Sequence, residues 1–138
     1  MRVPVGVYCD DLDSFGMLHN SRYGRLVERA WNTYWEGRDL THAGDGDAPG
    51  DGLNLIKEIH LTYEVAVTRP GNYTVHLWTD HLDSTTLSYG FRFCSTDLTT
   101  TYAHGSRVIV RIDPGTLLPT PWNASTRSLA ARIQRITS

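Results

Sequence analysis

One segment restricts the possible folds of this chain more than any other: a single amphipathic helix with an unusually wide apolar face. The spacing predicts a helix from about Ser21 to Glu36, with Ser21 or Asn20 as the N-cap and Gly37 as the stop signal. The apolar face comprises Tyr23, Leu26, Val27, Ala30, Trp31, Tyr34 and Trp35. Other elements must cover a face this wide.

Most of the remaining chain has the alternating pattern of strands. The predicted strands lie at about 2–9, 55–67, from 73, 87–93 and 102–112. Short turns between the later strands favour an antiparallel meander over parallel strands with crossover helices. A shorter helix is predicted from about Ser125 to Ile136. The expected fold is α+β: a curved antiparallel sheet of about five strands wraps one long central helix, and a short C-terminal helix follows.

Composition limits the class of protein. A length of 138 residues suits a single domain, 1–138, and a net charge of −2 offers no electrostatic attraction for nucleic acid or an anionic membrane. Two cysteines, Cys9 and Cys94, are too few for a disulfide framework and are expected to be reduced core thiols. With neither a secretory apolar segment nor a membrane-span window, a soluble cytoplasmic protein is expected.

The segment just before the predicted helix contains residue types that are suited to catalysis. It reads Asp-Leu-Asp-Ser-Phe-Gly from Asp11 to Gly16, so two carboxylates and a glycine precede the helix entrance. A helix N-terminus presents backbone N–H groups without intrahelical partners and favours negative charge. A carboxylate in the same cleft can act as general base or nucleophile. Together these are the two parts of an acyl-transfer site.

In the order and spacing of its motifs, the chain resembles the hotdog-fold thioesterases, in particular the branch related to 4-hydroxybenzoyl-CoA thioesterase. The resemblance covers nearly the whole chain. It rests on Asp11-x-Asp13-x-x-Gly16, His19-Asn20, Tyr23, Glu28-Arg29-Ala30, Tyr63 before Arg69-Pro70-Gly71, and the segment 82–89.

The resemblance implies hydrolysis of an acyl or aroyl thioester of coenzyme A or an acyl carrier protein, without a cofactor. The family's catalytic carboxylate falls on Asp13, and its oxyanion donor falls on the backbone N–H of Asn20. Family active sites lie between subunits, which implies a homodimer or a dimer of dimers. Many relatives have His-Val-Asn-Asn directly after the glycine, whereas here Met17-Leu18-His19-Asn20 follows Gly16.

Several other residues are candidates, each with a structural alternative. His19 could orient Asp13, contact the acyl group or only satisfy the loop. Gly16 could allow a tight turn or close approach of substrate. Tyr23 could belong to the core or line the acyl pocket, and Asp11 is expected to be structural.

Two further positions, Thr86 and Ser88, could contact the pantetheine arm, although both residues also suit a strand. No metal site is expected. The histidines lack zinc-type spacing, and the aspartates of the predicted loop at 41–52 lack the glutamate that closes a calcium loop.

Two other functions remain open. A hotdog hydratase or dehydratase would need a histidine paired with a carboxylate, for which His19 and Asp13 are the only candidates. A non-catalytic module that binds acyl-CoA would tolerate the loss of Asp13.

Overall fold

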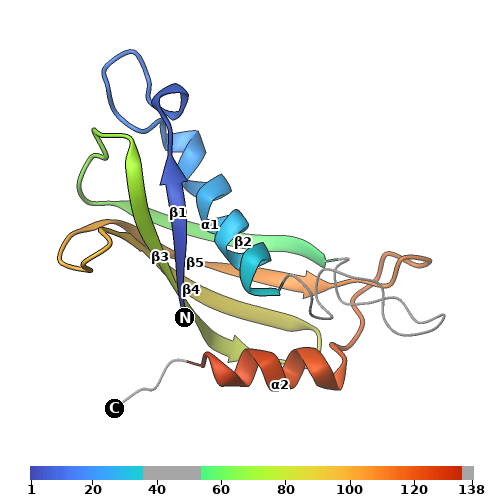
Figure 1. The fold of residues 1–138 in the computed structure, drawn as a ribbon. Helices are drawn as coiled ribbons and strands as arrows, with labels where there is room; N and C mark the ends of the chain where they lie inside the picture. Colours follow the sequence, from blue (N-terminus) through green and yellow to red (C-terminus); the bar gives the residue numbers. More distant parts are fainter. Residues whose placement is uncertain (36–53, 135–138) are drawn as a thin grey trace. The chain divides into compact units, whose positions relative to one another are not determined.

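The computed structural model describes residues 1–35 and 54–134. These residues form a five-stranded antiparallel sheet with strand order β1-β3-β4-β5-β2 (Figure 1). The strands are β1 (Arg2–Val7), β2 (Asn54–Tyr63), β3 (Gly71–Leu82), β4 (Thr86–Cys94) and β5 (Thr101–Arg111). The helices are the 3-10 turn η1 (Cys9–Asp11), α1 (Asn20–Trp35) and α2 (Ala124–Arg132). The predicted α+β class and the five strands are confirmed.

The strand order corrects part of the predicted topology. β1 pairs antiparallel with β3, so that Arg2 lies opposite His76 and Val7 opposite Gly71. The meander holds for β3, β4 and β5 only, because β2 lies beside β5 and not beside β3. Residues 64–70 separate β2 from β3 and include Pro70, so this connection is longer than a hairpin turn. β1 and β2 therefore form the two edges of the sheet.

β2 also ends earlier than the apolar alternation predicts. The backbone N–H groups of Glu64 and Val65 both donate to the carbonyl oxygen of Tyr102, at 2.9 and 3.1 Å. Two residues thus oppose one, which is the geometry of a β-bulge and ends regular pairing. Because the apolar pattern continues to Val67, the sequence gives no sign of this bulge.

The chain divides into two compact units, and the first contains residues 1–34, 61–77 and 91–105. Its core contains an aromatic cluster: Tyr23 of α1 packs edge-on against Phe93 at 5.7 Å between ring centroids, and Tyr73 stacks on Phe93 at 5.4 Å. The predicted apolar face of α1 is buried at Tyr23, Leu26, Val27, Ala30 and Trp31. This burial stabilises α1 and fixes the position of its N-terminal end; the predicted stop at Gly37 lies outside the described residues.

The second unit includes residues 78–90 and α2. The side chain of Asn123 caps α2 by accepting the N–H of Thr126 at 2.9 Å. The backbone N–H of Trp122 donates to the carbonyl of Ser84, and that of Thr79 donates to the carbonyl of Ile133, both at 2.9 Å. These bonds attach the C-terminal segment to β3 and to the β3–β4 turn. The predicted second helix is confirmed, with its observed end at Arg132.

A close contact in this unit predicts a stability effect. A Cβ atom at Gly90 would lie 2.4 Å from the indole of Trp78, whose Nε1 donates to Asp80 at 2.9 Å. We expect Gly90→Ala to destabilise the protein by about 1–3 kcal/mol through overpacking. Thermal unfolding followed by circular dichroism measures this. In a Trp78→Leu background the added cost of Gly90→Ala should shrink; an equal cost in both backgrounds would contradict the steric explanation.

Three further expectations concern membrane-spanning helices, metal sites and the two cysteines. In residues 1–35 and 54–134, no helix has the length and apolarity to cross a membrane. The same residues contain no cluster of three or more histidine, cysteine or acidic side chains able to hold a metal ion. Cys94 is buried, but Cys9 is exposed, so the expectation of a core position was wrong for Cys9. The predicted loop at 41–52 lies outside the described residues.

Candidate active site

A cavity of about 380 Å³ lies at the entrance of α1, within the first unit. It brings together four of the residues predicted for the site, namely Asp13, His19, Asn20 and Tyr23. The lining residues are Asp13, Met17, Leu18, His19, Asn20, Tyr23, Tyr63, Glu64, Val65 and Ala66. The lining therefore combines apolar and aromatic side chains with four polar ones, Asp13, His19, Asn20 and Glu64.

A tight backbone loop holds Asp13 in place. An isolated bridge between Leu12 and Leu18 closes the loop. Inside this loop, the N–H of Asp13 donates to the carbonyl of Met17 at 2.7 Å, and the N–H of Gly16 donates to the carbonyl of Asp13 at 3.0 Å. Gly16 has a φ of 76°, in the left-handed region where glycine pays no steric penalty. Gly16 thus forms a tight turn, one of the two roles predicted for it, and it is not among the cavity-lining residues.

The carboxylate of Asp13 is oriented by the same loop. Its Oδ1 accepts the backbone N–H of Phe15 at 2.8 Å and that of Met17 at 3.2 Å. An ionised carboxylate can accept at both oxygens, and for Oδ2 the described residues provide no hydrogen-bond donor. One oxygen thus fixes the side chain and the other remains able to take a proton from water or to attack a carbonyl carbon.

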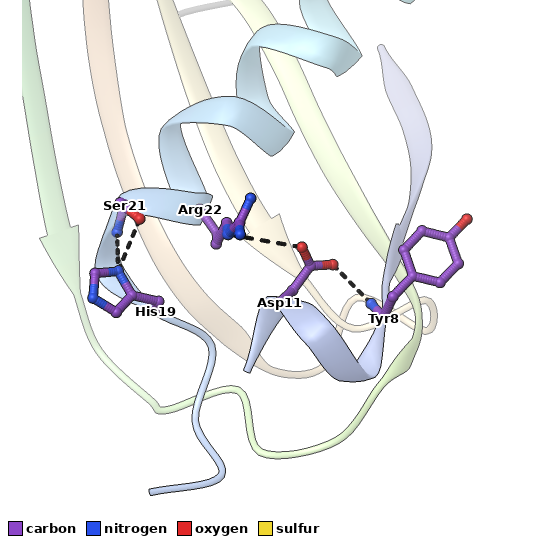
Figure 2. Close-up of polar contacts among 5 residues, drawn as sticks. All are labelled: Tyr8, Asp11, His19, Ser21 and Arg22. Atoms are coloured by element: carbon purple, nitrogen blue, oxygen red, sulfur yellow. Dashed lines mark hydrogen bonds and ion pairs between the residues drawn. The ribbon is translucent and has the colours of Figure 1, made fainter. Parts of the chain in front are cut away.

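Asp11 has a structural role, as predicted. Its Oδ2 accepts the backbone N–H of Tyr8 at 2.8 Å, and its Oδ1 lies 3.9 Å from Nε of Arg22 on α1 (Figure 2). Its carbonyl oxygen accepts the N–H of His19 at 3.3 Å. Asp11 therefore links the end of β1 to the first turn of α1.

His19 caps the helix, a role that sequence reasoning had given to Ser21 or Asn20. Its Nδ1 accepts the backbone N–H of Ser21 at 3.1 Å and lies 2.8 Å from the Ser21 hydroxyl (Figure 2). Its carbonyl accepts the N–H of Arg22 at 2.9 Å. Because a backbone N–H can only donate, Nδ1 is the acceptor in the bond with the Ser21 N–H. Histidine is an unusual cap, so composition gave no signal for this role.

Three backbone N–H groups at the helix entrance differ in their hydrogen-bond acceptors. Ser21 and Arg22 donate to the side chain and the carbonyl of His19. For the N–H of Asn20, the first residue of α1, the described part of the chain provides no acceptor. An unpartnered N–H at a helix N-terminus is suited to receive an anionic oxygen. It belongs to the residue predicted as the oxyanion donor.

Tyr23 is both a core residue and a lining residue. Its side chain is 4% exposed, and its ring packs edge-on against Tyr63 at 5.1 Å and against Phe93 at 5.7 Å. Burial raises the pKa of Tyr23 above its usual value, so the phenol stays neutral at physiological pH. Tyr23 thus contributes a rigid apolar wall with one polar tip.

The two positions proposed for the pantetheine arm belong to the second unit. Thr86 and Ser88 lie on β4, and the Thr86 hydroxyl donates to Asp83 Oδ2 at 3.3 Å. Neither is among the residues that line the cavity. Contact between these residues and a substrate stays a prediction.

Sequence reasoning did not assign a site role to the segment 63–66. All four residues line the cavity, although alternate residues of a regular strand would point to opposite faces. Glu64 also pairs with His104 of β5 at 3.7 Å. The only sequence signal was the place of Tyr63 ahead of the Arg-Pro-Gly turn.

Comparison with protein families identifies the chain. Residues 7–130 match the thioesterase-like superfamily, so most of the sequence is covered and the chain belongs to this superfamily. Among curated proteins, none matches it.

Solved structures share the fold over nearly the full length. The PA5185 protein of Pseudomonas aeruginosa is 20% identical with a TM-score of 0.87, and the match covers 100% of this chain and 94% of that one. The PA2801 protein of the same species, provisionally described as a thioesterase, is 25% identical with a TM-score of 0.78, covering 92% and 95%. The protein SAV2348 from Staphylococcus aureus, solved in complex with CoA, is 15% identical with a TM-score of 0.80, covering 99% and 87%.

Proposed function

We propose that this protein hydrolyses an acyl or aroyl thioester of coenzyme A or of an acyl carrier protein. The observation that carries the proposal is the presence, in the lining of one cavity, of the Asp13 carboxylate and of Asn20, whose N–H has no acceptor within the described residues. Membership of the thioesterase-like superfamily supports thioester chemistry. The Asp11-x-Asp13-x-x-Gly16 pattern supports the branch related to 4-hydroxybenzoyl-CoA thioesterase.

In the proposed reaction the thioester carbonyl oxygen points to the N–H of Asn20 and its carbonyl carbon faces Asp13. Asp13 Oδ2 either takes a proton from the attacking water or attacks the carbon itself to give an anhydride that water then opens. The C–S bond breaks, the thiol leaves with a proton, and the acid is released. The N–H of Asn20 stabilises the negative charge on the carbonyl oxygen during addition.

Coenzyme A is the carrier that the comparisons favour, because a structural neighbour was solved in complex with CoA. The apolar side chains of the lining suit an acyl group with little polarity. The Tyr23 and Tyr63 rings form part of that lining and suit either an alkyl chain or a flat ring.

A hydratase has less support, because it needs a histidine paired with a carboxylate and the described residues show no hydrogen bond between His19 and Asp13. Nδ1 of His19 instead accepts the N–H of Ser21 (Figure 2). His19 Nε2 could still contact a substrate, which keeps a substrate-binding role for this residue within the proposal.

The test is release of free thiol from a panel of short, long and aromatic acyl-CoAs, with the same acyl groups on a carrier protein in a parallel set. Turnover of any member at a saturable rate supports the proposal, and the best member identifies the acyl group. Saturable binding without thiol release from either carrier would instead establish a binding module. Addition of water to an enoyl-CoA without thioester cleavage would establish a hydratase.

We further propose that the protein is a homodimer, or a dimer of dimers, joined through β2. This edge strand exposes apolar side chains, which is uncommon in a strand that must avoid pairing with other chains. Exposed residues on and just after β2 include Leu55, Ile56, Ile59, Tyr63 and Val65. A second copy could cover them and continue the sheet.

Replacing Ile59 with lysine should therefore shift the protein to monomers. Ile59 is 53% exposed on the edge strand, and a lysine there would carry charge into the proposed interface. Sedimentation velocity over a concentration series measures the change, with Glu58→Lys as a control at a neighbouring exposed position that is already charged. Wild-type protein that sediments as a monomer at every concentration would contradict this assembly.

A further inference from the structure

Tyr63 connects the end of β2 to the first residue of α1. Its hydroxyl donates to the carbonyl oxygen of Asn20 at 3.3 Å, across 43 positions of sequence. Its ring meets Tyr23 edge-on, with centroids 5.1 Å apart and planes at 77°. Tyr23 in turn is buried against Phe93. The hydroxyl of Tyr63 is thus held by a ring that rests on a rigid part of the core.

The β-bulge explains how Tyr63 reaches the helix. Regular pairing stops after Tyr63, where Glu64 and Val65 share the carbonyl of Tyr102. A bulge bends its strand and redirects the neighbouring side chains. The four consecutive lining residues 63–66 are what such a change produces. The local backbone is therefore shaped to bring this segment to the helix entrance.

The bond to Asn20 has no evident role in forming α1. In an α-helix the first carbonyl accepts the N–H four residues later, so the tyrosine hydroxyl is a second donor to the same oxygen. Tyr63 is also 51% exposed, so burial alone does not explain its position. The bond does link Tyr63 to the backbone of Asn20, the residue whose own N–H lacks an acceptor within the described ranges.

We infer that Tyr63 is a positioning residue: it holds the backbone of Asn20 so that its N–H points into the cavity. The inference rests on the proposed function, since an oriented N–H matters for catalysis only if an oxyanion forms there. A fixed donor stabilises charge without reorganising during the reaction, whereas a mobile donor must first be ordered. Tyr63 acts through Asn20 and need not touch the substrate.

The test variant is Tyr63→Phe, which removes the hydroxyl and keeps the ring contact with Tyr23. We expect kcat to fall about tenfold with KM nearly unchanged, which is less than the ~100–1000-fold typical for deleting an oxyanion donor outright. The matched control is Tyr73→Phe. It removes another tyrosine-to-carbonyl bond of the same unit, to Arg69 at 2.6 Å, at a position that does not line the cavity. This control should keep the wild-type kcat.

A second measurement does not depend on turnover. The backbone 15N order parameter of Asn20 should be about 0.85 in the wild type and in Tyr73→Phe, and fall clearly in Tyr63→Phe. An unchanged order parameter in Tyr63→Phe overturns the inference, as does an unchanged kcat. A lower order parameter in a protein that hydrolyses no thioester supports the positioning of Asn20 and refutes only the proposed reaction.

Discussion

Asp13→Asn should lower kcat by about a thousandfold while leaving the fold and KM close to those of the wild type. General-base catalysis is typically worth ~10²–10⁴-fold, and an amide can neither take the proton nor attack the thioester. The substitution is nearly isosteric. The remaining side-chain oxygen can still accept the N–H groups of Phe15 and Met17, so the loop should keep its shape. Steady-state thiol release measures the loss.

The matched control is Asp11→Asn, which changes a carboxylate of the same loop. Asp11 binds Tyr8 and lies near Arg22, and it is not a lining residue. We expect a small loss of stability and little loss of kcat. If Asp13→Asn retains wild-type turnover, or if both variants lose it equally, Asp13 is not the catalytic carboxylate. A melting temperature recorded for each variant separates lost chemistry from lost fold.

The sequence predicted the elements of this fold because their signals are local. The helical spacing of apolar residues in α1 and the alternation in β4 and β5 gave the right element types, with boundaries close to those observed. The placement of β2 beside β5 was missed, because strand order depends on contacts between distant segments. The bulge after Tyr63 was missed for the same reason: it consists of two N–H groups that meet one distant carbonyl.

In the candidate site, too, some features could be predicted from the local sequence and others depend on contacts that only the structure shows. Asp13 and Asn20 are predicted for the site from their place ahead of a helix and from the resemblance to a family, and both line the cavity. The role of His19 as the cap could not be predicted, because Ser21 and Asn20 are much commoner caps. The structure makes His19 the acceptor for Ser21, and this leaves the N–H of Asn20 as the donor without a partner in the described chain. Asn20 is therefore distinguished from its neighbours by its hydrogen bonds, which the sequence alone does not show.

The variant Asn20→Pro tests whether the N–H of Asn20 is the oxyanion donor. Proline lacks the N–H but suits the first helical position, where its fixed φ is already correct. It also favours an extended conformation in the preceding residue, which is the usual conformation of an N-cap such as His19. The carbonyl that accepts the Tyr63 hydroxyl is retained. The variant therefore deletes the proposed oxyanion donor while α1 and its attachment to β2 should persist.

We expect Asn20→Pro to lower kcat by ~100–1000-fold, corresponding to about 2.7–4 kcal/mol of transition-state stabilisation. Asn20→Ala, which keeps the backbone N–H and loses only the side chain, should lose far less. Circular dichroism and thermal unfolding of both variants establish that the helix has formed. Equal losses in the two variants would assign the effect to the side-chain amide. Wild-type turnover in Asn20→Pro would show that the oxyanion is stabilised by another group, and the helix entrance would then serve only to hold Asp13 and its loop.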